Sequence, residues 1–126
     1  MKSRFTFILL LIVMALSACA GEVIGVPEER MVNDGSIEHG RQLMASYGCG
    51  SCHSIPRVPG AESIVGPNLQ GIAARAYIAG VLPNTPENMI RWIMDPPSVD
   101  EKTAMPNLHV KAEQARDIAA YLYTLQ

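Results

Sequence analysis

Cys49-Gly50-Ser51-Cys52-His53 is the stretch of this sequence that decides the fold. Two thiols separated by two residues can each add to one of the two vinyl groups of a haem, and a histidine directly after the second cysteine is then placed beneath the iron. The stretch therefore predicts one covalently bound haem c, attached through Cys49 and Cys52, with His53 as an axial ligand of the iron.

Two other interpretations of this stretch are open. A thioredoxin-like dithiol needs a strand before the two cysteines and a helix after them, within a βαβ pattern that this sequence does not show. A zinc site needs two further ligands, and the remaining histidines are His39 and His109. Haem is the preferred interpretation because the sequence also begins with an export signal, and covalent haem attachment takes place outside the cytoplasm.

The first 19 residues are typical of a secretory signal peptide. Lys2 and Arg4 precede an apolar run over 5–16, and small residues follow it. That run is shorter than the about 20 apolar residues that a membrane-spanning helix needs.

Within this signal, Leu16-Ser17-Ala18-Cys19 is similar to a bacterial lipobox, so we expect Cys19 to carry lipid and to anchor the exported protein at the periplasmic or outer face of the membrane. Ordinary cleavage after Ala20 is the alternative, and it would release a soluble periplasmic protein. The cysteine count favours the anchor, because three cysteines then divide into one for lipid and two for haem.

The rest of the chain divides into a flexible tether over 20–33 and one domain over 34–126. Apolar periodicity and capping residues predict helices over 36–47, 85–94 and 111–125, with short helical pieces over 69–79. No stretch has the alternation typical of a strand. The predicted class is all-α, with three to five short helices and long loops rich in Gly and Pro wrapped around one haem.

The charge balance excludes nucleic acid as a partner. The chain has 10 basic and 12 acidic residues, and removing Lys2 and Arg4 with the signal leaves 8 basic residues and a net charge of −4. Phosphate binding needs a basic patch or stripe, and this sequence has neither.

Outward from the motif, the sequence resembles the class I monohaem cytochromes c, over nearly the whole stretch 34–126. It is especially similar to bacterial cytochrome c domains that occur alone or joined to subunits of haem-copper oxidases. The resemblance rests on a Gly40-bearing helix that leads into the motif, Gly66-Pro67-Asn68-Leu69-Gln70-Gly71, Arg75, Trp92, Pro96, Thr103, Met105-Pro106, and the final helix with Ala115-Arg116-Asp117-Ile118-Ala119-Ala120-Tyr121-Leu122.

The resemblance implies that Met105 is the second axial ligand of the iron. A thioether on the second side favours the reduced state and raises the reduction potential. Met105 lies in a loop between Pro96-Pro97 and the last helix, whereas Met44, Met89 and Met94 lie on helices, where core packing is the simpler role. His39 and His109 are expected at the surface.

The resemblance also implies roles around the haem. The Pro67 carbonyl would accept a hydrogen bond from the His53 ring, Leu69 would pack on the haem, and Arg75 would meet a propionate. Thr103 is a weaker candidate for the propionate and Trp92 for the distal pocket. Gly40 and Tyr121 are expected where the first and last helices cross, with the Tyr121 ring filling the space beside the glycine.

The function that follows is electron transfer, with no catalytic residues. Partners would be redox proteins such as a terminal oxidase or a dehydrogenase. The alternative is a haem-based enzyme or gas-sensing subunit, which needs an open iron position and polar groups on the distal side. The sequence shows no acid and base pair for such chemistry.

Overall fold

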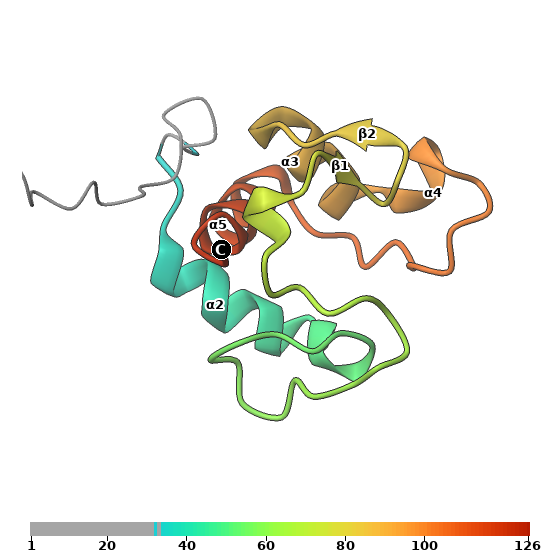
Figure 1. Cartoon of the computed structure of the whole chain (residues 1–126). Coiled ribbons are helices and arrows are strands. Elements are labelled where there is room, and N and C mark those ends of the chain that lie inside the picture. Colours follow the sequence, from blue (N-terminus) through green and yellow to red (C-terminus); the bar gives the residue numbers. More distant parts are fainter. Residues whose placement is uncertain (1–31, 33) are drawn as a thin grey trace, which may run out of the picture.

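The computed structural model describes Val32 and residues 34–126 (Figure 1). The predictions for the signal peptide, for lipid on Cys19 and for nearly all of the tether concern residues outside this described part. In the part that is described, no helix has the length and apolar character required to cross a membrane.

Helix α2 spans Ile37–Ser46 and begins at a side-chain cap. The Oγ atom of Ser36 accepts the His39 backbone N–H at 3.3 Å, which satisfies one of the free donors of the first turn. Beyond the helix, Gly48 adopts a left-handed conformation with φ 72°, which a residue with a Cβ adopts at a cost. The predicted helix over 36–47 is confirmed to within one residue at each end.

Helix α3 spans Pro86–Met94, and the Thr85 hydroxyl caps it by accepting the Asn88 N–H at 3.3 Å. It ends before Pro96, as predicted. A short helix α4 over Pro96–Val99 follows, which the sequence had not led us to expect. Two prolines fit its first turn because the N–H groups that they lack have no partner there.

Helix α5 spans Ala112–Leu122, inside the predicted range of 111–125. The apolar face predicted for it is buried, and so is the segment that follows it. The buried residues of this face are Ala115, Ile118, Ala119, Leu122 and Leu125.

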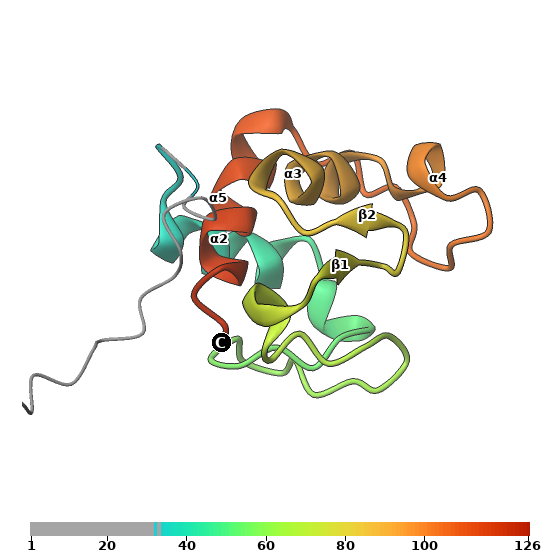
Figure 2. The ribbon, with the colours of Figure 1, turned by 45° about the horizontal axis from the view of Figure 1, so that its top comes forward.

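Helices α2 and α5 pack against each other and approach closely at Gly40 (Figures 1 and 2). A Cβ on Gly40 would lie 2.0 Å from the backbone oxygen of Asp117. The crossing expected at Gly40 is confirmed, and the atoms nearest to the glycine belong to the α5 backbone. Tyr121 is buried on the same helix, and its hydroxyl donates a hydrogen bond to the Pro56 carbonyl.

A small antiparallel hairpin lies where the sequence predicted no strand. Strand β1 (Tyr77–Ile78) pairs with β2 (Leu82–Pro83), so that Ile78 faces Leu82. Two-residue strands are too short to show alternation, which explains the wrong prediction. The helical pieces expected over 69–79 reduce to one 3₁₀ turn, η4, over Ile72–Ala74. The class remains all-α, because this hairpin is the whole sheet content of the described residues.

One buried polar side chain connects the hairpin to the rest of the fold. Asn84 is 5% exposed, and its amide nitrogen donates to the carbonyls of Ile72 and Arg75, both at 2.8 Å. Its oxygen accepts the Tyr123 hydroxyl at 2.8 Å. Because every polar atom of the amide is paired, Asn84 joins the loops to the end of α5 at little desolvation cost.

The core lies between α2, α3 and α5. Met44 and Met89 are each 2% exposed, which confirms their prediction as core residues, and Met94 is half-buried. Trp92 is also buried in this core.

Candidate functional site

The cysteine motif forms a single tight turn directly after α2. Residues Cys49–Ser51 make the 3₁₀ turn η3, and the backbone N–H groups of Cys52 and His53 donate to the Cys49 carbonyl at 3.2 and 3.0 Å. Cys49 and Cys52 are half-buried and carry free thiols. The turn therefore holds two thiols and one imidazole together, as attachment of a single haem requires.

The His53 ring is held in one tautomer. Its Nδ1 atom lies 2.7 Å from the Pro67 carbonyl oxygen. A carbonyl can only accept, so Nδ1 must carry the hydrogen, and the neutral ring then has its lone pair on Nε2. This is the usual state of a metal-ligating histidine, whose second nitrogen donates to a fixed acceptor. Pro67 thus lies where the resemblance implied.

Gly66 packs directly against the same ring. A Cβ on Gly66 would lie 2.7 Å from Cε1 and 2.9 Å from Nδ1 of His53, closer than real contacts allow. Its backbone N–H donates to the Cys52 carbonyl at 2.6 Å. Gly66 is a positioning residue that the sequence analysis did not single out, although the Gly66-Pro67 pair was the available signal.

Leu69 and Arg75 belong to the loop that follows Pro67. The Leu69 N–H donates to the Ser54 carbonyl at 2.9 Å, which fixes this loop beside the motif. Arg75 donates through Nη2 to the carbonyls of Asn68 at 2.5 Å and Gln70 at 3.4 Å. These contacts use one nitrogen of a guanidinium that has five N–H donors, so Arg75 has capacity for an anionic group as well.

Met105 lies on a different segment, the loop between α4 and α5, and is half-buried. Its backbone N–H donates to the Thr103 hydroxyl oxygen at 3.1 Å, which is the structural role observed for Thr103. In Figure 1 this segment (orange) runs on from α4 at the right, and the loop after the motif (green) lies at the bottom of the view, beyond the end of α2.

Asn107 anchors the Met105 segment, which the sequence analysis missed. Its Nδ2 donates to Asp95 Oδ1 at 2.9 Å, and its Oδ1 accepts the His109 backbone N–H at 2.7 Å. Asp95 directly follows α3 and caps its C-terminal end. The segment is thus tied both to the end of α3 and to the approach to α5.

The other two histidines lie at the surface, as expected. The His39 side chain is 53% exposed, with Nδ1 2.7 Å from Oδ2 of Asp117 on α5, and His109 is exposed. Over Val32 and 34–126, no three His, Cys, Asp or Glu side chains gather into a group that could hold a metal ion.

Burial raises the pKa of the Cys49 thiol, and the neighbouring Cys52 adds to the effect. A raised pKa keeps this thiol protonated at neutral pH.

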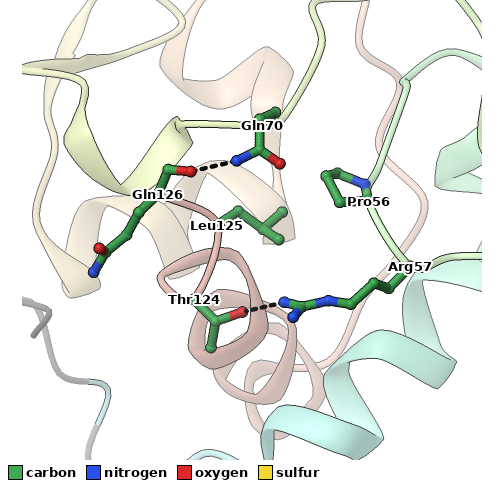
Figure 3. Close-up of a pocket in the computed structure, with 6 residues that line it drawn as sticks. All are labelled: Pro56, Arg57, Gln70, Thr124, Leu125 and Gln126. Atoms are coloured by element: carbon green, nitrogen blue, oxygen red, sulfur yellow. Dashed lines mark hydrogen bonds between the residues drawn. The ribbon is translucent and has the colours of Figure 1, made fainter.

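The surface pocket drawn in Figure 3 is formed by other residues. It lies beside the last residues of the chain, where Arg57 Nη2 donates to Thr124 Oγ1 at 3.3 Å and the Gln70 amide donates to the Gln126 carbonyl. The lining contains Pro56, Arg57, Gln70, Thr124, Leu125 and Gln126. None of the predicted site residues is among them.

The donor atoms of the site fit a haem c. Two free thiols, an imidazole with its lone pair on Nε2, and a thioether from a separate segment are the groups that covalent attachment and two-sided iron ligation use. On the histidine side, the close contact with Gly66 also fixes where the His53 ring lies.

Comparison with known proteins gives a match over the same region. The family model described as "Cytochrome c" matches residues 37–126. The chain is 33% identical to cytochrome c oxidase subunit 2 of Alkalihalophilus pseudofirmus, over 79% of this chain and 27% of that protein. It is 31% identical to cytochrome c oxidase subunit 2 of Bacillus subtilis, over 68% of this chain and 25% of that protein. The chain thus spans about a quarter of the length of these relatives.

Proposed function

The chain belongs to the cytochrome c family, and on this premise we propose that it is an electron carrier with one covalently bound haem c. Family membership supports a haem-binding role in electron transfer. The observation that carries the proposal is the His53 ring, held by the Pro67 carbonyl with Nε2 available, directly after two free thiols.

In this proposal Cys49 and Cys52 would hold the haem through thioether bonds, and His53 Nε2 and Met105 Sδ would bind its iron. The haem supplies the one-electron chemistry when it is bound. The chain's own residues orient it: Pro67 and Gly66 fix the plane of the His53 ring, and Asn107 holds the Met105 segment. Leu69 would pack on the haem, and Arg75 would donate to a propionate through the nitrogens that its loop contacts leave unused.

Two axial ligands from the protein distinguish a carrier from the alternative, a haem enzyme or gas sensor with an open iron position. A carrier keeps the same ligands in both oxidation states, so little rearrangement accompanies electron transfer. The anchored Met105 segment supports this choice, because its tether to Asp95 leaves the methionine little freedom to move away.

We further propose that the partner is a terminal oxidase. Both relatives described above are named cytochrome c oxidase subunit 2, and this chain corresponds to about a quarter of each. A carrier that is homologous to part of such a subunit is suited to passing electrons to an oxidase. In this proposal lipid on Cys19 holds the protein at the periplasmic or outer face of the membrane, where it meets that partner.

The experiment for the haem proposal is expression of the full chain with and without the haem-attachment machinery. We expect colour that survives denaturation only when the machinery is present, a methionine-to-iron charge-transfer band in the oxidised protein, and no carbon monoxide binding in the reduced protein. Met105→Ala should lose the band and bind carbon monoxide. Prompt carbon monoxide binding by the unaltered protein would favour the enzyme or sensor instead.

The experiment for the anchor is fractionation of cells that express the unaltered chain or Cys19→Ser. We expect the unaltered protein in membranes and the variant in the soluble exported fraction. An unaltered protein that is itself soluble contradicts the lipid anchor and leaves the haem proposal untouched.

A further inference from the structure

Asn84 is a buried polar residue that bonds to several separate parts of the fold. Its amide nitrogen donates to the carbonyls of Ile72 and Arg75, and its amide oxygen accepts the Tyr123 hydroxyl, each at 2.8 Å. Its backbone N–H donates to the Ala76 carbonyl at 3.0 Å. With an exposed fraction of 5%, the side chain cannot turn away without leaving buried polar groups unpaired.

Three of these four bonds end on the short segment that presents Arg75. The 3₁₀ turn η4 ends at Arg75, whose backbone is extended with φ −71° and ψ 145°. The Ile72 carbonyl accepts the Arg75 N–H at 3.3 Å and the Asn84 amide as well. Asn84 directly precedes Thr85, the N-cap of α3, and Tyr123 directly follows α5. The Arg75 backbone is therefore tied to two helices.

The other end of Arg75 is held on the loop beside His53. The Nη2 atom of its guanidinium donates to the carbonyls of Asn68 at 2.5 Å and Gln70 at 3.4 Å. Asn68 directly follows Pro67, whose carbonyl oxygen lies 2.7 Å from Nδ1 of the His53 ring. A long side chain with many rotamers is thus held at its backbone and at its tip.

These contacts also set the direction of the remaining Arg75 donors. A guanidinium is planar and carries its five N–H groups in a rigid fork, so bonds at one nitrogen fix where the others point. Arg75 is half-buried, and water therefore screens its charge less than it screens a fully exposed charge. A shift of the Arg75 backbone would move this positive charge relative to the His53 loop.

The Asn84 amide contributes defined geometry more than net stability. Each buried hydrogen bond adds only about 0.5–1.5 kcal/mol, because the same groups bond to water in the unfolded chain. The two N–H groups of the amide end on the carbonyls at the two ends of η4, Ile72 and Arg75. An apolar side chain could fill the same space but could not fix both carbonyls.

From these observations we propose that Asn84 is a positioning residue for Arg75 and that, through Arg75, it fixes a positive charge on the histidine side of the haem. The inference rests on the proposed function, in which Arg75 meets a propionate, and it adds the residue that determines where Arg75 lies. A positive charge near the iron favours the reduced state, because reduction removes one positive charge from the iron. Loss of this position should therefore lower the reduction potential.

The test is a double-mutant cycle on the haem-loaded chain, with the reduction potential as the readout. Its members are the unaltered protein, Asn84→Leu, Arg75→Gln and the double variant. Leucine has a branched shape similar to asparagine and can neither donate nor accept. The matched control is Tyr47→Phe, which removes a 2.7 Å hydrogen bond from the Tyr47 hydroxyl to Gln114. Urea unfolding of each protein measures stability separately.

We expect Asn84→Leu to lower the potential in the same direction as Arg75→Gln, and by less. In the Arg75→Gln background the same leucine substitution should leave the potential unchanged, because no charge remains for it to move. Tyr47→Phe should lower the urea midpoint without changing the potential. Covalent haem and the methionine-to-iron band should be present in every protein.

A second variant keeps the test decisive where Asn84→Leu does not accumulate as a folded protein. Tyr123→Phe removes the bond to the Asn84 oxygen and leaves Asn84 itself in place. We expect a smaller fall of the potential than Asn84→Leu gives, and again no fall in the Arg75→Gln background.

Three results overturn the inference. An unchanged potential together with a lower urea midpoint in Asn84→Leu shows that Asn84 only stabilises the fold. An equal fall of the potential in both backgrounds shows that Asn84 acts independently of Arg75. An unchanged potential in Arg75→Gln removes the charge that the inference needs. A chain that takes up no covalent haem contradicts the proposed function itself, which is a separate outcome.

Discussion

Asn107 Nδ2 donates a 2.9 Å hydrogen bond to Oδ1 of Asp95, and this bond ties the segment that carries Met105 to the end of helix α3. The two residues are twelve positions apart and lie on opposite sides of α4, so the bond joins separate segments rather than closing a turn. The same amide accepts the His109 N–H, so removing it would leave two groups without this partner, the Asp95 carboxylate oxygen and the His109 N–H.

The first prediction concerns this bond. Asn107→Leu keeps the side-chain size but leaves Asp95 without its partner, at a cost of about 1–3 kcal/mol. We expect the methionine-to-iron band to disappear at a lower temperature, and carbon monoxide to bind where it does not bind the unaltered protein. The control is Asn88→Leu, which removes a similar 2.9 Å bond, to the Pro83 carbonyl, from the other end of α3. Equal loss of the band in both variants would contradict a role specific to Met105.

The second prediction concerns Gly66. Gly66→Ala places a Cβ 2.7 Å from the His53 ring, so the ring or the loop must shift. We expect less covalent haem per protein, measured by absorbance of denatured samples, and a changed reduction potential. Pro67→Ala is the control, because it keeps the backbone carbonyl that accepts from His53. A normal haem content and potential in Gly66→Ala would show that the contact is not needed.

The third prediction concerns the helix crossing. Gly40→Ala should destabilise the fold by about 1–3 kcal/mol or more, because the Cβ meets the Asp117 backbone, which cannot rotate away. Helix propensity alone predicts the opposite sign, a gain of about 1 kcal/mol. Urea unfolding measures the difference, with Ala45→Gly at an exposed site of the same helix as a control. A more stable Gly40→Ala protein would refute the close packing.

The fourth prediction concerns pH. Partial burial alone would raise the pKa of Asp117, but the Ser36 backbone N–H and the His39 side chain outweigh it and hold this pKa below its usual value. A lowered folded pKa means that the carboxylate stabilises the fold above its unfolded pKa of about 4, and that this contribution is lost as the pH falls through the folded value.

We therefore expect the urea midpoint of the unaltered protein to fall below about pH 4 by more than that of Asp117→Asn. Glu113→Gln, at an exposed position of the same helix, is the control and should follow the unaltered protein. Parallel curves for the unaltered protein and Asp117→Asn would show that the contacts of Asp117 do not contribute.

Local signals account for what could be predicted from the sequence. Ser36 and Thr85 cap helices through bonds to residues three positions away, so sequence spacing alone contains the information. The CxxCH motif and the Pro67 carbonyl were found because a motif and a family resemblance fix their positions. The confirmed core residues Met44 and Met89 followed from helical periodicity.

The features that were missed depend on contacts between remote segments. Nothing near Asn107 indicates that Asp95, twelve residues earlier, is its partner. The atoms that lie nearest to Gly40 depend on the exact angle at which α5 crosses α2, so the contact with the Asp117 backbone could not be predicted from the sequence. The hairpin over 77–83 is held by Asn84 and its bonds to Ile72, Arg75 and Tyr123 more than by any strand pattern.

Because Trp92 is buried, its fluorescence can report on the state of the core. It is the sole tryptophan of the chain, it lies on α3, and it is 8% exposed in the core. A haem bound in the same small domain would absorb its emission by energy transfer, so fluorescence would be dark in the loaded fold and bright once α3 separates from the cofactor. Opening of the core could thus be followed in time without any label.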